Sequence, residues 1–363
     1  MKRSSDPTID DTEYQLRMSE PLKGKLAISS FHGNEELGKL FEYRLDLISK
    51  ETDLEFNSVV GERITLEFDV HKGVRYFNGF VTEFSYTGSD RVYDHFQAVV
   101  RPWLWFLTRT SDCRIFQNQT VPDIIKSVLS DKGFSDYKVK LTGKYRNWDY
   151  CVQYRETDFN FITRLMEQEG IFFYFEHEDG KHNLVLVDDS SSCSTFKGEK
   201  NIVFLPHSRG INVDEPDYLQ SLTVNQSIQA SKYELNDYNF TKPRNPMLAR
   251  GEKKRPHPTP LSDSEYFDYP GEYQEHRDGQ KYAAIRLEEV QSQFERIQVS
   301  GPCRWLAAGS VFTLTDHPRE DQNREYLNVA TSWRIVNGGF ESGTSETYEY
   351  HFTAELIDKK EPF

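Results

Sequence analysis

Hydrophobic and polar residues alternate along residues 23–101, which is the pattern of short β-strands with one buried face. The alternation is clearest where Ile64, Leu66, Phe68 and Val70 fall on one side of the chain. Gly, Asn and Asp separate five such segments, which read KLAISSFHG, LFEYRLDLIS, RITLEFDV, RYFNGFVTEFSYTG and YDHFQAVVRP. Five short antiparallel strands close most economically as a small barrel or sandwich, so we predict a β-domain here.

The hydrophobic period then changes to that of a helix, in the segment RIFQNQTVPDIIKSVLSDKGF. Thr120 and Asp123 form an N-terminal capping pattern, and Pro122 is tolerated in the first helical turn. The apolar residues that follow share one helical face and comprise Ile124, Ile125, Val128 and Leu129. Gly133 marks the end of this predicted helix.

Residues 150–175 predict a strand, a capped helix and a second strand with almost no connecting residues. Asp158 is placed to cap the helix, and Gly170 stands where a helix needs a left-handed terminating residue. The apolar face between them comprises Phe159, Ile162, Leu165 and Met166. A hairpin with Asp179-Gly180 at its turn follows, and then a Ser-rich linker, so this middle region is predicted to be α+β.

The third region returns to strands around residues 219–238 and again after residue 293. Between them lie a Pro-rich, acidic loop and one more helix, for which Asp278 is the predicted cap. The apolar positions of that helix include Tyr282, Ile285 and Leu287. The fold class is therefore predicted to be mainly β, with two strand blocks around a mixed region and no repeat detectable by sequence identity.

Composition and charge limit the functions to consider. The chain has 363 residues, of which 14% are aromatic, and these supply ample core and favour strands. The formal net charge of −14 argues against a large nucleic-acid-binding surface, because phosphate contacts need clustered cations. The basic stretch from Arg250 to Pro258 is predicted to be a solvated loop, since acidic residues follow it at once.

The cysteines and the N-terminus predict a chain that is made in the cytosol. The four cysteines, Cys113, Cys151, Cys193 and Cys303, are dispersed, which favours reduced thiols over a disulfide framework or a zinc site. Residues 1–20 are polar and are predicted to be a disordered arm without a signal peptide. No run approaches the roughly 18 to 20 apolar residues of a membrane span, so we expect no stable membrane insertion.

The usual catalytic motifs are missing from the sequence, including G-x-S-x-G, the P-loop, G-x-G-x-x-G and H-E-x-x-H. His177 and His182 come nearest to a metal motif, but they are five residues apart and flank a predicted hairpin turn. Asp188 and Asp189 are adjacent on a strand, so their side chains point to opposite faces and suit a turn better than acid–base catalysis.

Two further groups of residues have a structural and a functional interpretation. His317, in the segment His317-Pro318-Arg319-Glu320, is predicted to lie in a loop between strands and not to be catalytic. Trp103 and Trp105 could stack on a sugar or a base, but alternate aromatic residues leaving a strand are more often core. We therefore predict no catalytic, metal or cofactor-binding residue, and no enzymatic activity.

The run YCVQYRETDFNFITRLMEQEGIFFYF, at residues 150–175, closely resembles the signature VQY-E-S/T-D-x-x-F-I-x-R-L-x-E-x-E-G-I of the VgrG family. VgrG proteins are the spike proteins of type VI secretion. Further strings resemble the family in the same order, including VVGERITLEF, NGFVTEF, VVRPWLWFLTRTSDCRIFQNQTVPDII and GSVFTLTDHP. Together the similar segments span residues 22 to about 350.

The resemblance implies the architecture of the contractile phage tail hub, with two antiparallel β-barrels in each subunit of a trimer. It implies a trimeric adaptor that caps the hexameric Hcp tube and carries effectors, made in the cytoplasm and then secreted by the type VI machine. The expected divisions are an arm at 1–20, a first barrel at 21–105, a mixed domain at 106–200, and a second barrel at 201–363 with an excursion at about 243–291.

Family members continue into an oligonucleotide/oligosaccharide-binding-like barrel and a β-helix needle that receives a PAAR-repeat tip, and neither lies within these 363 residues. Membrane puncture and tip binding are therefore not expected of this segment. Two alternatives stay open at this stage. One is a phage-tail or phage-derived injection hub with the same fold, and the other is a hydrolase of cell-wall glycan.

Overall fold

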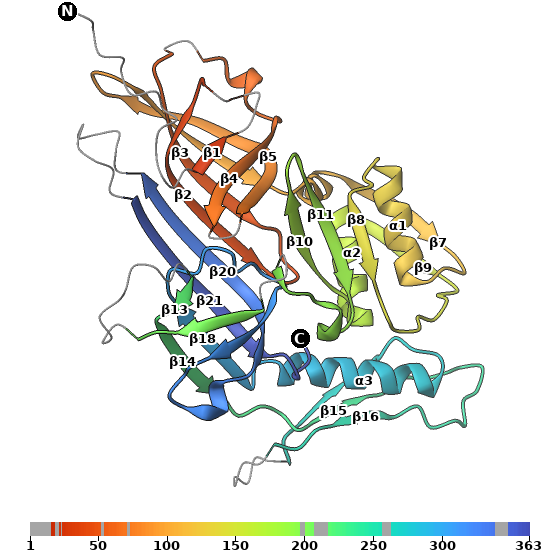
Figure 1. Ribbon diagram of the computed structural model, residues 1–363. Coiled ribbons are helices and arrows are strands. Elements are labelled where there is room, and N and C mark those ends of the chain that lie inside the picture. Colours follow the sequence, from red (N-terminus) through yellow and green to blue (C-terminus); the bar gives the residue numbers. More distant parts are fainter. Residues whose placement is uncertain are drawn as a thin grey trace, which may run out of the picture.

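The structure, a computed structural model, describes residues 16–18, 22, 24–51, 54–70, 73–196, 200–206, 217–255, 263–337 and 348–363. Its largest feature is a 13-stranded sheet that joins the two strand blocks expected from the sequence (Figure 1). The mixed region and a helix-covered excursion pack beside this sheet. The fold is thus mainly β with an α+β middle region, as the sequence predicts.

The first strand unit consists of five antiparallel strands, which are β2 (Ala27–Glu36), β3 (Glu42–Ser49), β4 (Arg63–Val70), β5 (Gly73–Ser89) and β6 (Asp94–Arg101). Their order in space is β2-β3-β6-β5-β4. An additional strand, β1 (Leu16–Met18), pairs with β4, and Met18 is buried. The prediction of a disordered arm is therefore wrong at residues 16–18, and residues 1–15, 19 and 20 lie outside the described residues.

The second strand unit also consists of five antiparallel strands, which are β14 (Ser221–Gln226), β18 (Glu295–Ser300), β19 (Val311–Thr315), β20 (Glu325–Asn337) and β21 (Tyr348–Asp358). Their order in space is β14-β18-β21-β20-β19. In both units the strands therefore lie in the order first, second, fifth, fourth, third. The units differ at their outer edge, where β12 (Asn201–Phe204) pairs with β19 in parallel, whereas β1 pairs with β4 antiparallel.

Details of the backbone repeat between the two units as well. Gly61 precedes β4 with φ of +93°, and Gly309 precedes β19 with φ of +82°. The Gly61 N–H donates to Val81 of β5 at 2.8 Å, and the Gly309 N–H donates to Asn328 of β20 at 2.8 Å. A bulge directly follows Val81 in the pairing of β5 with β6, and one follows Asn328 in the pairing of β20 with β21. The chain thus contains a structural duplication, which sequence identity alone did not reveal.

A strand-to-strand contact joins the units into one sheet. Residues 30–36 of β2 pair antiparallel with residues 330–336 of β20, from Ser30 opposite Val336 to Glu36 opposite Ala330. The short β19 covers only the first residues of that edge of β20, so β2 occupies the remainder. Within the described residues the strand pairings do not close into a barrel, and the expected pair of barrels stays a prediction.

The mixed region begins with a 3₁₀ segment, η2 (Trp103–Arg109), and contains two helices and five strands between residues 111 and 187. These are β7 (Ser111–Phe116), α1 (Val121–Asp131), β8 (Tyr137–Lys140), β9 (Cys151–Thr157), α2 (Asp158–Glu169), β10 (Phe172–Glu178) and β11 (Lys181–Val187). Thr120 caps α1, and the predicted apolar face of α1 is buried. β10 and β11 form the predicted hairpin. The expected linker after it instead forms a short 3₁₀ turn, η3 (Ser190–Ser192), beside the buried Cys193.

Helix α2 is central to the mixed region, but its cap differs from the prediction. The Thr157 hydroxyl accepts a hydrogen bond from the Asn160 N–H at 3.1 Å, so Thr157 is the cap. Asp158 is fully buried and forms an ion pair with Arg114 at 2.5 Å. Gly170 ends the helix with φ of +72°, as expected. The buried apolar side chains of α2 are Phe161, Ile162, Leu165 and Met166.

The excursion is a small three-stranded sheet with one helix packed against it (Figure 1). Its elements are β15 (Lys232–Leu235), β16 (Ala249–Glu252), β17 (Glu265–Asp268) and α3 (His276–Gln291). The excursion therefore includes residues 232–235, which were expected to belong to the second strand block. Asp278 was predicted to cap α3, and this is wrong, because the helix begins at His276 and Asp278 lies in its first turn. Tyr282 and Leu287 are buried as predicted, whereas Ile285 is only partly buried.

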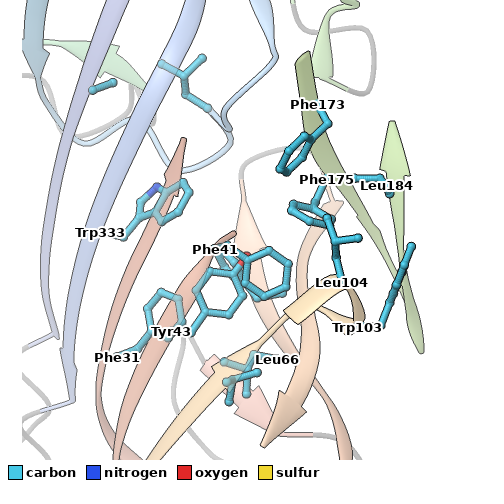
Figure 2. Packing of buried hydrophobic residues seen from close by; sticks show 14 of the residues in the cluster. Phe31, Phe41, Tyr43, Leu66, Trp103, Leu104, Phe173, Phe175, Leu184 and Trp333 are labelled. Carbon is cyan, nitrogen blue, oxygen red and sulfur yellow. The ribbon is translucent and has the colours of Figure 1, made fainter. Parts of the chain in front are cut away.

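The core runs without interruption from the first strand unit into the mixed region. Figure 2 shows Phe41 and Tyr43 of the first unit facing Phe175 of the hairpin, with Trp333 of the second unit nearby. The Phe41 ring stacks on Tyr43 with 4.5 Å between centroids and meets Phe175 edge-on at 5.0 Å. Aromatic packing of this kind fixes the hairpin against the sheet.

Candidate functional site

The hairpin histidines lie at the junction between the mixed region and the first strand unit. His177 and His182 are cross-strand partners, and their ring centroids are 5.9 Å apart. Their side chains are only 6% and 1% exposed. In the part of the chain that the structure describes, no group of three or more His, Cys, Asp or Glu could hold a metal ion. The two histidines therefore need another explanation.

Hydrogen bonds fix the orientation of the His177 ring. Its Nδ1 accepts from the Asn78 N–H at 3.0 Å, which assigns the proton of the neutral ring to Nε2. The Nε2–H group lies 3.0 Å from the Tyr43 hydroxyl, to which it donates. The Tyr43 hydroxyl in turn donates to Glu35 Oε1 at 2.7 Å. His177 is thus one end of a buried polar chain that leads to a carboxylate.

His182 is held in the opposite tautomer. Its Nε2 accepts from the Trp103 N–H at 3.0 Å, so Nδ1 carries the proton and donates to Asn78 Oδ1 at 2.8 Å. The Asn78 amide then donates to the Ile64 carbonyl at 3.1 Å and to the Thr65 hydroxyl at 2.7 Å. Both histidines are consequently connected through Asn78 of β5.

Arg75 joins this cluster to the second strand unit. Its Nη2 lies 3.7 Å from Glu35 Oε1, and the two side chains are 3% and 5% exposed. Its Nη1 donates to the carbonyls of Arg304 at 3.0 Å and Leu306 at 2.8 Å. The guanidinium carbon lies 4.2 Å from the centroid of the Trp333 ring, which gives a cation–π contact. A single buried side chain therefore contacts both strand units.

We name these residues (Glu35, Tyr43, Arg75, Asn78, His177 and His182) the junction cluster. Burial lowers the pKa of His182 to about 3, and burial together with His182 and Arg75 lowers the pKa of His177 well below its usual value. Burial raises the pKa of Glu35, although Arg75 opposes this shift. The cluster offers no open site for a substrate, so we interpret it as structural.

The depressed histidine pKa values predict acid sensitivity. Below about pH 6.5 the unfolded chain protonates these histidines and the folded chain does not, so the free energy of unfolding falls as pH falls. The expected loss is about 1.4 kcal/mol per pH unit for each histidine, until the folded pKa is reached. The free energy of unfolding, measured by urea denaturation at several pH values between 7 and 5, should fall less steeply with decreasing pH for His182→Gln than for the unchanged chain. Equal slopes would contradict the prediction, and the comparison cancels the opposing contribution of Glu35.

The paired aspartates that follow the hairpin are turn residues, as predicted. Asp188 accepts hydrogen bonds from the Thr142 N–H at 2.9 Å and the Gly143 N–H at 2.7 Å. Asp189 accepts from the Ser191 N–H at 2.7 Å and so caps η3. The two carboxylates serve different backbone segments and do not form an acid–base pair.

The structure also places the other residues that the sequence analysis singled out. Trp103 is buried and stacks on Phe134 with 4.5 Å between ring centroids, although it belongs to η2 and not to a strand. Trp105 is partly buried in the same segment. His317 lies in the loop between β19 and β20, where its ring packs against Phe204.

The basic segment that begins at Arg250 was expected to be a solvated loop, and this holds only in part: residues 250–252 belong to β16, whereas residues 253–255 have no regular secondary structure and Lys254 is exposed. Arg250 belongs to β16 and forms an ion pair with Glu234. Lys253 and Arg255 bind the carboxylate of Glu361 at 2.9 and 2.6 Å. These cations are paired with carboxylates within the chain. The remaining residues of the segment, 256–258, lie outside the described residues.

The cysteines and the helices add no further site. Cys113 is exposed, Cys151, Cys193 and Cys303 are buried, and all four thiols are free. No helix in the described ranges has the length and the apolar character to cross a membrane. A groove of about 1130 Å³ lies beside α2 and α3, but charges of both signs line it. Lys281, for example, contacts Glu169 at 2.7 Å, so some of these charges are already paired within the chain.

The fold combines two five-stranded units of the same strand order with a mixed α+β region between them. Residues 34–339 match the phage tail baseplate hub (GPD) family, and the chain belongs to that family. The solved structure of a type VI secretion component, the E. coli c3393 protein, superposes with a TM-score of 0.70 at 18% identity. The superposition covers 96% of this chain and 78% of the c3393 protein, which is structurally similar to the T4 bacteriophage tail proteins gp27 and gp5.

Two curated relatives come from Pseudomonas aeruginosa. The type VI secretion system spike protein VgrG1b is 42% identical over 330 residues, which is 90% of this chain and 44% of that protein. VgrG1a is 41% identical over 340 residues, which is 93% of this chain and 52% of that protein. The resemblance to the VgrG family is thereby confirmed, and the chain spans about half the length of these relatives.

Proposed function

We propose that this chain is the base of a type VI secretion spike, a trimeric adaptor that caps the Hcp tube. The observation that carries the proposal is the duplicated five-stranded unit. Three chains with two such units each would present six similar units in a ring. A sixfold arrangement of units is what a trimer needs in order to sit on a tube of hexameric rings.

In this proposal the two strand units act as the two barrel domains, at residues 21–105 and 201–363, with the mixed domain at 106–200 between them. The role is non-enzymatic. Effectors and a PAAR-repeat tip are proposed partners of the whole spike, and the type VI machine would carry the assembled spike out of the cell. Nucleic acid and the membrane are not proposed partners.

The similarity supports a secretion spike over a phage injection hub. The curated relatives at 41–42% identity are secretion spike proteins. The likeness to the E. coli c3393 structure, at 18% identity, supports the fold alone. A cell-wall hydrolase has no comparable support. It would gain support if the chain cleared a peptidoglycan suspension and an acidic-residue substitution abolished the clearing.

Electron microscopy of the chain mixed with Hcp tubes tests the proposal. We expect class averages with threefold symmetry and a central bore, seated on the ends of the tubes. Bovine serum albumin at the same concentration is the control for adventitious binding. Tube ends left bare at a salt and protein concentration where light scattering shows the chain to be a trimer would contradict the proposal.

We predict that the trimer of this chain is weak and depends on salt. Each chain has a formal net charge of −14, so three chains gather −42. Repulsion between exposed charges extends about 30 Å at 0.01 M ionic strength but only about 10 Å at 0.1 M, so low salt favours the monomer. Light scattering across an ionic-strength series measures this. A trimer that survives both low salt and dilution would show that the chain-to-chain contacts outweigh the charge.

A further inference from the structure

Two strand edges of this chain are left without a partner strand. In the described residues, the outer edge of β14 pairs with no strand, and residues 83–89 of β5 pair only with β6. Among the residues that the structure describes, neither segment takes part in backbone hydrogen bonds outside the strand ladders. Resting on the proposed function, we propose that β14 of one copy pairs with residues 83–89 of β5 in the next copy and so joins the sheets of the two chains.

The chain already contains the equivalent contact within itself. β2 is the first strand of its unit and pairs with the free part of β20, the fourth strand of the other unit. β14 is the first strand of the second unit, and β5 is the fourth strand of the first unit. The pairing of β14 with β5 therefore repeats the β2–β20 contact with the two units exchanged. It cannot form within one chain, because that ladder already separates β14 from β5 by several strands.

The duplication also defines the register of the proposed contact. The shared bulge makes Val81 equivalent to Asn328, so Glu83 corresponds to Ala330 and Tyr86 to Trp333. For the first strand of each unit, the pairing of β2 with β3 and of β3 with β6 has the same register as the pairing of β14 with β18 and of β18 with β21. This match makes Gly33 of β2 equivalent to Val224 of β14.

Gly33 lies opposite Trp333 in the chain, so Val224 should lie opposite Tyr86 of the neighbouring copy. By the same equivalence, Asn225 should lie opposite Ser85.

The exposure of these residues fits a missing neighbour. Trp333 is 1% exposed, whereas its equivalent Tyr86 is 51% exposed. Both lie opposite a buried phenylalanine on the next strand, Phe352 and Phe96 respectively, so Tyr86 also faces the core side of its sheet. The proposed strand would cover Tyr86 with Val224, which is itself only partly buried.

The composition of both edges is unusual for edges that stay in water. Natural edge strands are commonly protected by lysine, proline or other charged residues. β14 reads SLTVNQ and residues 83–89 read EFSYTGS, so neither contains lysine, arginine or proline. The one charge, Glu83, is held by Arg101 of the adjacent strand at 2.6 Å. In a chain with 28% charged residues, two nearly uncharged edges indicate strand addition.

The contact is head-to-tail, because each copy offers one β14 edge and one β5 edge. Such a contact closes into a ring or continues as a filament, depending on the rotation between copies. In a closed ring of three, the β2–β20 contact within chains would alternate with the β14–β5 contact between chains. Six units would then be joined by six similar strand pairings.

Disulfide trapping tests the register directly. Asn225→Cys and Ser85→Cys are combined in a chain whose exposed Cys113 is replaced by serine, and the protein is oxidised at 0.15 M salt. Both positions are exposed and polar, so the substitutions should leave the fold intact. Residues directly opposite on antiparallel strands have Cβ atoms about 4.5–5.5 Å apart, close enough for a disulfide after a small shift. We expect most of the chain to migrate as linked dimers and trimers on a non-reducing gel, with no larger species.

Asn225→Cys with Ser89→Cys is the matched control, because Ser89 lies about 13 Å along the strand from the predicted partner. The control should show less than a tenth of the linking. Equal linking by both pairs, or no linking by either, would overturn the proposed contact.

The proposed contact and the proposed function fail in different ways. A trimer in light scattering that does not link through Ser85 would leave the spike function standing and refute the β14–β5 contact. Linking in the predicted register that continues beyond three chains would support the contact and refute the threefold ring.

Discussion

Replacing Arg75 by methionine is expected to lower the free energy of unfolding by about 3–5 kcal/mol. The change leaves the carboxylate of Glu35 buried without its cation and removes the donor of the Arg304 and Leu306 carbonyls. Methionine keeps a similar apolar bulk against Trp333, so the loss reflects charge and hydrogen bonding more than a cavity. Urea denaturation at pH 7, followed by fluorescence and circular dichroism, measures the effect.

Arg44→Met is the matched control for this prediction. Arg44 also pairs with a glutamate, Glu42, at 2.9 Å, but its side chain is 62% exposed. An exposed pair of this kind contributes less than about 1 kcal/mol. Adding Glu35→Gln to Arg75→Met should recover part of the loss, because it removes the unpaired buried charge. If Arg75→Met were no more destabilising than Arg44→Met, the junction cluster would not hold the two strand units together.

Replacing Leu165 by aspartate is expected to prevent stable folding of the mixed region. Leu165 is 1% exposed on the buried apolar face of α2, so the substitution would bury a carboxylate in that face. Burying an unpaired charge costs several kcal/mol, which is a large part of the 5–15 kcal/mol that stabilises a typical domain. The measurements are the soluble yield and the thermal melting of the purified chain.

Asn160→Asp introduces the same residue into the same helix at an exposed position of its first turn. A negative charge near a helix N-terminus is neutral or mildly stabilising, so this control should melt within a few degrees of the unchanged chain. A soluble Leu165→Asp chain with an unchanged melting temperature would mean that α2 does not contribute its apolar face to the core.

Local patterns were enough to predict the elements whose signals are local. The cap at Thr120, the hairpin turn at Asp179-Gly180 and the αL residue Gly170 each depend on a few neighbouring side chains. The sequence predicts Asp158 as the cap of α2, whereas the cap is the preceding residue, Thr157. Thr157 and Asp158 are both good caps by composition, and the choice was decided by Arg114, which comes from a different strand and binds Asp158.

The junction cluster could not be predicted from the sequence, because its members come from distant segments. Glu35, Arg75 and Asn78 interrupt the hydrophobic pattern of their strands, and that interruption was the one available signal. It indicates a buried polar group only after the partner segments are known. The duplication was hidden for a related reason, since strand order and bulges are conserved between the units while most side chains differ.

The seven-residue pairing of β2 with β20 has a consequence for how the chain comes apart. Because this ladder and Arg75 connect the two strand units through one sheet, neither unit can open without exposing the edge and the core of the other. We therefore expect the units to form a single cooperative block in hydrogen exchange, with the protection of amides in β3 and in β21 set by the same global opening. Loads applied to one half of the subunit reach the other through hydrogen bonds that must break together.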